Sequence, residues 1–181
     1  MPRKTQLMQK VVGVMLDTMK SILIVYHSMT GGTLQMAQAA AAGATCEGTV
    51  DVRLLHAPAA GPSDVLAADA YLFATPENLG AVSGLLKDFF DRCYYPALER
   101  INGRPYATLI CAGSDGANAA RQIERIATGW RLKAIAEPLI VCTHAQTPEA
   151  ILQPKTIAAD ELARCAELRA ALATGLALGV F

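Results

Sequence analysis

Short apolar runs alternate along the chain with longer stretches in which apolar residues recur at helical spacing. Five of the runs are strand-sized and nearly all apolar, and they cover residues 22–26, 50–55, 70–74, 106–111 and 139–142. Strands without polar alternation are typical of a parallel sheet that helices cover on both faces. The pattern therefore predicts an α/β protein in which crossover helices join five parallel strands.

Four helices are predicted in the gaps, over residues 33–42, 85–93, 117–128 and 157–175. The second has an apolar stripe, expected in the core, that consists of Leu85, Leu86, Phe89 and Phe90. Residues 56–69 contain two prolines and leave room for only a brief helix. We expect a doubly wound sheet with strand order 2-1-3-4-5. Its ligand should lie outside the carboxyl ends of the strands, at the loops after strands one, three and four.

The length of 181 residues fits one domain. Residues 19–181 are expected to form it, because a strong strand follows Met19 and Lys20 almost directly. Residues 1–18 form an appended segment without a clear signal-peptide pattern. Two interpretations of this segment stay open: a poorly ordered extension, or a mis-assigned start with Met19 as the true first residue.

Charge and composition exclude several classes of protein. Lys plus Arg and Asp plus Glu both number 16, so the chain lacks the basic surplus that nucleic-acid binding requires. No apolar run approaches the roughly 18 residues of a membrane-spanning helix, so we expect neither a nucleic acid nor a membrane as partner. Five scattered cysteines favour reduced thiols and a cytoplasmic location. The three histidines have no companions at ligand spacing, so no metal site is expected.

The loop after the first strand, YHSMTGGT over residues 26–33, combines hydroxyls and glycines directly before a helix. The helix N-terminus offers unpaired amides and the positive end of the dipole, and Ser28, Thr30 and Thr33 add hydroxyl donors. Such a loop can hold a phosphate monoester without a lysine. It matches neither G-x-x-x-x-G-K-[ST] nor G-x-G-x-x-G, which argues against nucleotide-hydrolysing and dinucleotide loops. The alternative is an ordinary glycine turn before a Ser/Thr-capped helix.

Two motifs, in this order along the chain, resemble one protein family. SMTGGT, residues 28–33, is similar to the flavodoxin phosphate-binding motif [ST]-x-T-G-x-T. TPENLGAVSGLLKDFFDRC, residues 75–93, resembles the T-P-x-x-x-G-x-x-S-G-x-x-K-x-F-x-D-R segment of flavodoxin-fold quinone reductases and related NAD(P)H-dependent FMN reductases. A third glycine-rich loop, AGSDGA at 112–117, matches more loosely. The resemblance implies a flavodoxin-like fold that binds FMN.

The resemblance also implies three groups of FMN-binding residues. The phosphate would be cradled by Ser28, Met29, Thr30, Gly31, Gly32 and Thr33. The isoalloxazine would be bordered by Pro76, Glu77, Asn78, Leu79 and Gly80, and closed on its other side by Gly113, Ser114, Asp115 and Gly116. For the second and third loops, the alternative interpretations are a Pro/Gly connection that starts a core helix and a plain turn.

Charge and aromatic content favour a reductase over an electron carrier within this family. Carriers of the family are typically acidic, whereas this chain has a net charge of 0, which makes a fully reduced flavin easier to form. Carriers also commonly stack the ring between aromatic side chains, but Trp130 is expected far from the three loops and the second and third loops contain no aromatic residue.

We therefore expect hydride transfer from NADPH or NADH through FMN to a quinone, a free flavin or a similar small-molecule acceptor. No catalytic acid or base is assigned, and Asn78 and loop amides are candidates to stabilise charge on the flavin. Glu77 and Asp115 are expected to be solvated loop carboxylates; the alternative is that they tune the potential of the flavin. The alternatives are a non-enzymatic electron carrier and a flavodoxin-fold domain without flavin. The resemblance also implies a homo-oligomer.

Overall fold

A computed structural model describes residues 19–43 and 50–181. The predicted extension, residues 1–18, and one of the five cysteines, Cys46, lie outside the described residues. The remaining cysteines, Cys93, Cys111, Cys142 and Cys165, are free thiols. Within the described ranges, no helix is long and apolar enough to cross a membrane.

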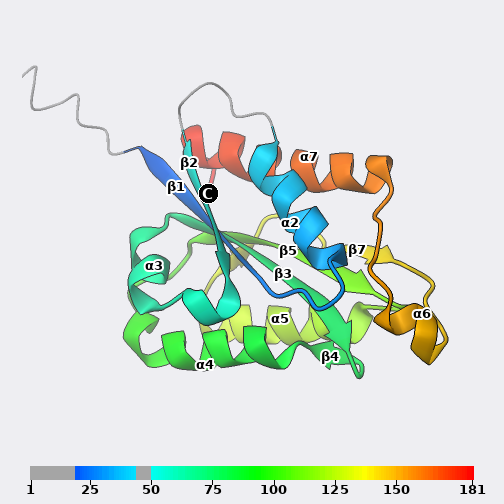
Figure 1. Cartoon of the computed structure of the whole chain (residues 1–181). Coiled ribbons are helices and arrows are strands. Elements are labelled where there is room, and N and C mark those ends of the chain that lie inside the picture. Colours follow the sequence, from blue (N-terminus) through cyan, green and yellow to red (C-terminus); the bar gives the residue numbers. More distant parts are fainter. Residues whose placement is uncertain (1–18, 44–49) are drawn as a thin grey trace, which may run out of the picture.

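A parallel sheet forms the centre of the molecule (Figure 1). Its long strands are β1 (Lys20–Tyr26), β2 (Val50–His56), β3 (Ala70–Asn78), β5 (Pro105–Ala112) and β7 (Leu139–Cys142). They lie in the order β2-β1-β3-β5-β7, which confirms the predicted order 2-1-3-4-5. The sequence missed two strands of two residues each, because so short a segment shows no periodicity: β4 (Ala81–Val82), antiparallel to the end of β3, and β6 (Lys133–Ala134), beside the start of β5.

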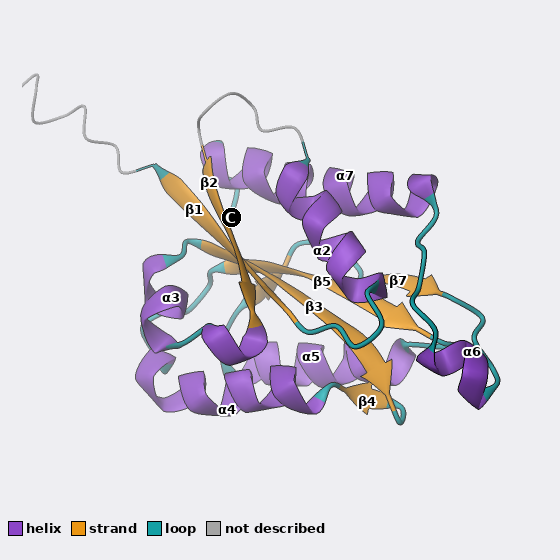
Figure 2. Cartoon of the chain, in the orientation of Figure 1, coloured by secondary structure: helices purple, strands orange, loops and turns teal. Residues whose placement is uncertain are grey.

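Helices cover both faces of the sheet (Figure 2). One face carries α2 (Gly32–Ala42) and α7 (Ala159–Ala177), and the other carries α3 (Pro62–Ala67), α4 (Gly84–Ala97) and α5 (Ala117–Gly129). All four predicted helices are present, and the predicted brief helix in residues 56–69 is α3, preceded by the 3-10 turn η1 (Ala57–Ala59). The short helix α6 (Pro148–Leu152) was not predicted.

Alternate residues of the strands build a separate core on each face. On β1, Leu23 and Val25 pack toward α3, α4 and α5, whereas Ile22 and Ile24 pack toward α2 and α7. All four are fully buried, as the lack of polar alternation in this strand predicts. Trp130 is buried among core aromatic rings, as expected for a residue away from the three loops.

The predicted core stripe of α4 is wrong at one position. Leu86, Phe89 and Phe90 are buried, but Leu85 is 43% exposed. Successive helical residues are about 100° apart, because one turn takes about 3.6 residues. Since Leu86 points into the core, its neighbour Leu85 points away from it.

The carboxyl ends of β1, β3, β5 and β7 meet at one edge of the sheet. The loop before α2, the β3–β4 hairpin, the loop before α5 and helix α6 all lie at this edge (Figure 1). The fold therefore brings together segments that are up to about 120 residues apart in the sequence, as the hydrogen bonds of Gln35 described below show.

Candidate functional site

The first loop, residues 28–33, turns sharply from β1 into α2. Gly31 has a φ of 86°, in the left-handed region that favours glycine, and its N–H donates to the Ser28 hydroxyl oxygen at 3.1 Å. The first amides of α2 have no acceptor within the helix and face the end of the sheet. Thr33 is 1% exposed, and its hydroxyl lies beside the Cys111 thiol without a nitrogen or oxygen partner among the described residues. The loop therefore offers donors that an anion could use.

Gly32 is required because the first loop packs tightly against two other segments. A Cβ at this position would lie 2.6 Å from the Sγ of Cys111 and 3.3 Å from the Cβ of Lys155. Atoms at 2.6 Å clash, so any other residue would displace either the end of β5 or the segment after α6.

The second loop is a hairpin whose base is held by two hydroxyls. Glu77 pairs with Val82, and Leu79 and Gly80 form the turn with φ values of 51° and 67°. Below the turn, Thr75 and Ser83 are buried, and the Thr75 hydroxyl donates to the Ser83 hydroxyl and accepts from the Ser83 N–H, both at 3.1 Å. This pair explains why the T-P-x-x-x-G-x-x-S pattern has a hydroxyl at each end.

Glu77 connects the second loop to the third. Its carboxylate accepts hydrogen bonds from the Gly116 N–H at 2.8 Å and the Ala119 N–H at 3.4 Å, so it caps the N-terminus of α5. The expectation that Glu77 is a solvated carboxylate is therefore wrong. Asp115 is exposed, as expected.

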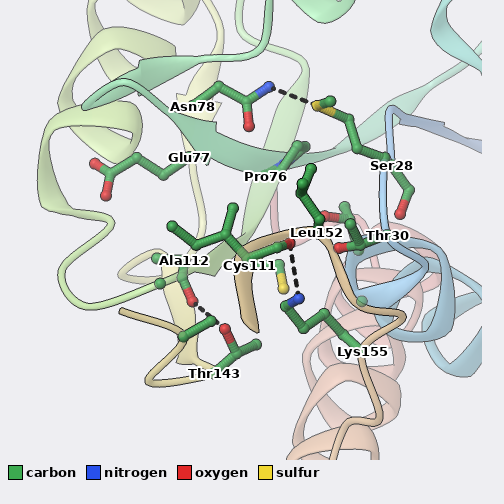
Figure 3. Close-up of a pocket in the computed structure, with 16 residues that line it drawn as sticks. Ser28, Thr30, Pro76, Glu77, Asn78, Cys111, Ala112, Thr143, Leu152 and Lys155 are labelled. Carbon is green, nitrogen blue, oxygen red and sulfur yellow. Dashed lines mark hydrogen bonds between the residues drawn. The ribbon is translucent and has the colours of Figure 1, made fainter. Parts of the chain in front are cut away.

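A pocket lies where the three loops meet (Figure 3). Nine of the predicted residues line it: Ser28, Met29, Thr30, Gly32, Thr33, Pro76, Glu77, Asn78 and Gly113. The Asn78 amide donates to the Met29 sulfur at 3.5 Å across the mouth, which links the first two loops. The cavity itself measures about 110 Å³, below the roughly 300 to 1,000 Å³ of an enclosed small-molecule site, and it opens to solvent at its mouth.

Six predicted residues do not line the pocket: Gly31, Leu79, Gly80, Ser114, Asp115 and Gly116. Gly31 and Gly116 precede α2 and α5 and allow the left-handed turn into each helix. Leu79 and Gly80 stand exposed at the tip of the hairpin, and Ser114 is exposed in the third loop.

The sequence missed seven residues that line the pocket: Cys111, Ala112, Thr143, Ala145, Ile151, Leu152 and Lys155. Two belong to the end of β5, and five follow β7. The predicted topology gave one indication, because the fifth strand of a 2-1-3-4-5 sheet ends at the same edge as the others. The loop after it was not considered, because it carries no glycine-rich motif.

Gln35 fastens the segment after α6 to the first loop. We call residues 153–157 the strap. The Gln35 amide donates to the Gly31 carbonyl at 3.1 Å and to the Lys155 carbonyl at 2.6 Å, and its oxygen accepts from the Ile157 N–H at 3.1 Å. The Lys155 N–H donates to the Thr30 carbonyl at 2.8 Å. The strap is therefore fixed to the first loop, and it contributes Lys155 to the lining of the pocket.

Burial disfavours charge on two side chains near the pocket. His27 is 8% exposed, and burial together with the nearby His56 imidazole lowers its pKa below the ordinary value of 6.5. Burial raises the pKa of the Cys111 thiol. Both groups are therefore neutral near pH 7.

In the described part of the chain, no cluster of three metal-binding side chains occurs. None of the residues that line the pocket is aromatic.

Comparison with protein families gives a match to the model of NADPH-dependent FMN reductase over residues 59–147. A flavodoxin of Aquifex aeolicus is 37% identical over 99 residues, which cover 54% of this chain and 53% of that protein. An NAD(P)H dehydrogenase (quinone) of Acidithiobacillus ferrooxidans is 31% identical over 94 residues, 41% of this chain and 47% of that protein. The chain thus spans about half the length of the curated relatives it matches.

Solved structures share the fold over most of the chain. An archaeal flavodoxin superposes with a TM-score of 0.69 at 18% identity and covers 86% of this chain and 98% of its own. A flavodoxin, WrbA-like protein from Agrobacterium tumefaciens gives a TM-score of 0.66 at 18% identity over 88% of this chain and 98% of its own. These similarities confirm the predicted flavodoxin-like fold.

Proposed function

We propose that this chain, which belongs to the flavodoxin-like superfamily of FMN reductases and quinone reductases, is an FMN-binding oxidoreductase. It transfers reducing equivalents from NADPH or NADH to a small-molecule acceptor such as a quinone or a free flavin. The observation that carries the proposal is the convergence of the first loop, the hairpin and the third loop on one pocket at the carboxyl edge of the sheet.

The residues of the pocket fit FMN at its phosphate end. The buried Thr33 hydroxyl, the free first amides of α2 and the close packing at Gly32 make a tight cradle of donors for an oxyanion. In the proposal, Ser28, Met29, Thr30, Gly31, Gly32 and Thr33 hold the phosphate. The isoalloxazine would lie between residues 76–80 and residues 113–116.

FMN, when bound, supplies the two-electron chemistry of the reaction. The chain's own residues position it. The Thr75 and Ser83 hydroxyls fix the base of the hairpin, and Glu77 fixes the hairpin to α5. Asn78, at the mouth, has an amide that can donate to a group developing negative charge.

The lack of aromatic side chains among the described residues of the pocket favours a reductase. An aromatic cover would occupy a ring face, whereas an uncovered face leaves room for a nicotinamide and then an acceptor. The alternative is a flavodoxin-type electron carrier, the class named for the Aquifex relative.

Exposed apolar side chains lie near the mouth of the pocket, among them Met29, Leu79 and Leu152. They fit either an apolar acceptor or a second copy of the chain, in line with the proposed homo-oligomer. The free thiols fit the proposed cytoplasmic location.

Two measurements test the proposal. The first is FMN binding by the wild-type chain, Thr30→Ala and the control Arg125→Ala, which changes an exposed residue of α5. Loss of one charge-assisted hydrogen bond should weaken FMN binding by about tenfold or more in Thr30→Ala only.

The second measurement is the consumption of NADPH and NADH by the FMN-loaded protein with quinones and free flavins as acceptors. FMN binding without NAD(P)H oxidation would instead support the carrier.

A further inference from the structure

Lys155 brings a positive charge to the first loop from the other end of the sequence. Its N–H donates to the Thr30 carbonyl at 2.8 Å, and its Cβ would lie 3.3 Å from a Cβ on Gly32. Among the described residues that line the pocket, it is the one that carries a positive charge. Gln35 holds its backbone in place through the Lys155 carbonyl. The lysine is therefore anchored beside the loop that, in our proposal, holds a phosphate.

The ammonium of Lys155 has neutral partners only among the described residues. Nζ donates to the carbonyls of Ala150 at 2.6 Å, Ile151 at 2.9 Å and Gln153 at 2.6 Å; the dashed line from Lys155 in Figure 3 marks one of these bonds. These carbonyls satisfy its donors, but no carboxylate of the described chain forms an ion pair with it. Its positive charge therefore remains uncompensated at the wall of the pocket.

The donors of the first loop can bind a phosphate monoester, but they neutralise only part of its charge. Such a group carries a charge of about −1.5 to −2 near pH 7. A helix N-terminus contributes the equivalent of about +0.5. Residues 26–33 contain no lysine or arginine, so about one unit of negative charge is left without a partner.

We propose that Lys155 is the counter-ion of the FMN phosphate and thereby makes the site select FMN over riboflavin. The inference rests on the proposed function. The lysine stem is flexible and its donors rotate, so the ammonium can turn from the α6 carbonyls to the phosphate oxygens while the strap stays in place. Hydrogen bonds to a charged oxygen are stronger than those to neutral carbonyls, which favours the exchange.

The test is a titration of flavin-free protein with FMN and with riboflavin, followed by flavin fluorescence. It compares the wild-type chain with Lys155→Met, Lys155→Arg and Lys133→Met. Lys133 is an exposed lysine in β6, which pairs with the opposite end of β5. Riboflavin lacks the phosphate, so it reports any general damage to the pocket.

Lys155→Met should weaken FMN binding by about 10- to 100-fold and leave riboflavin binding within about twofold. Lys155→Arg should retain most of the FMN affinity, Lys133→Met should retain all of it, and the salt dependence of FMN binding should be smaller in Lys155→Met than in the wild type. Equal weakening of both flavins, or unchanged FMN binding, would overturn the role of Lys155. Failure of the wild-type chain to bind either flavin would instead refute the proposed function.

Discussion

The Glu77 carboxylate accepts a hydrogen bond from the Gly116 N–H at 2.8 Å and so joins two loops that both border the pocket. Glu77 belongs to the hairpin, and Gly116 is the residue before α5. The negative carboxylate lies at the positive end of that helix, where each stabilises the other. A flavin between these loops would meet walls whose spacing is set by this contact.

Removal of the Glu77 cap should lower stability. We expect Glu77→Ala to reduce the free energy of unfolding by about 1 to 2 kcal/mol, and Glu77→Gln by less, because the amide oxygen can still accept one of the bonds. Chemical denaturation measures the change. Glu124→Gln, an exposed change on the same helix, is the matched control and should have little effect. Equal stability of Glu77→Ala and the control would contradict the capping role.

The close approach at Gly32 predicts a steric coupling. Gly32→Ala places a Cβ 2.6 Å from the Cys111 sulfur and should cost about 1 to 3 kcal/mol of stability. In a Cys111→Ala background the same change should cost clearly less, because the sulfur is gone. Gly129→Ala, where a Cβ would meet nothing within 4 Å, is the control. A double-mutant cycle with no coupling between positions 32 and 111 would refute this packing.

Leu79 combines full exposure with a left-handed backbone at the tip of the hairpin. An Asn is better suited to this φ of 51°, so Leu79→Asn should raise stability by about 0.5 to 1 kcal/mol. If the leucine contacts the acceptor, the same variant should show a higher KM for a quinone. Glu99→Asn, at φ 63°, should share the gain in stability without a change in KM. A KM that stays the same in Leu79→Asn would remove Leu79 from the acceptor site.

His27 predicts a loss of stability in mild acid. Its folded pKa is below 6.5, so the unfolded chain takes up the proton first as pH falls. Stability is therefore unaffected by this group above pH of about 6.5 and decreases as pH falls from there through the folded pKa. Urea unfolding measures the free energy of unfolding at a pH of about 7.5 and of about 5.5. Between these two pH values it should decrease less in His27→Gln than in the wild type. The exposed His144→Gln serves as control, and identical decreases in wild type and His27→Gln would contradict the prediction.

The sheet was predictable because its strands are apolar throughout. The run at 139–142 matches β7 to the residue, and β1, β2 and β5 extend the predicted runs by one to two residues. The end of β3 was not predictable from periodicity, because the residues at 75–78 are mostly polar. Thr75 and Pro76 extend the strand by pairing with β5, and Glu77 and Asn78 extend it by pairing with β4.

The site was predictable where a local motif marks it. The segment at 28–33 carries a glycine turn and a helix start within six residues, and all of its residues except Gly31 line the pocket. Lys155 has no such signal. Its place beside Thr30 depends on the β7 register, on α6 and on the hydrogen bonds of Gln35, which are long-range contacts. The role of Glu77 was missed for the same reason, because its partner Gly116 is 39 residues away.

Reduction of bound FMN by NADPH or NADH is tested most directly by the visible absorption spectrum of the FMN-loaded protein, recorded without oxygen before and after addition of each nucleotide. A two-electron reductase predicts rapid bleaching of the bound flavin by at least one of the two nucleotides. Bound flavin that stays oxidised with both nucleotides would contradict the reductase and leave an electron carrier.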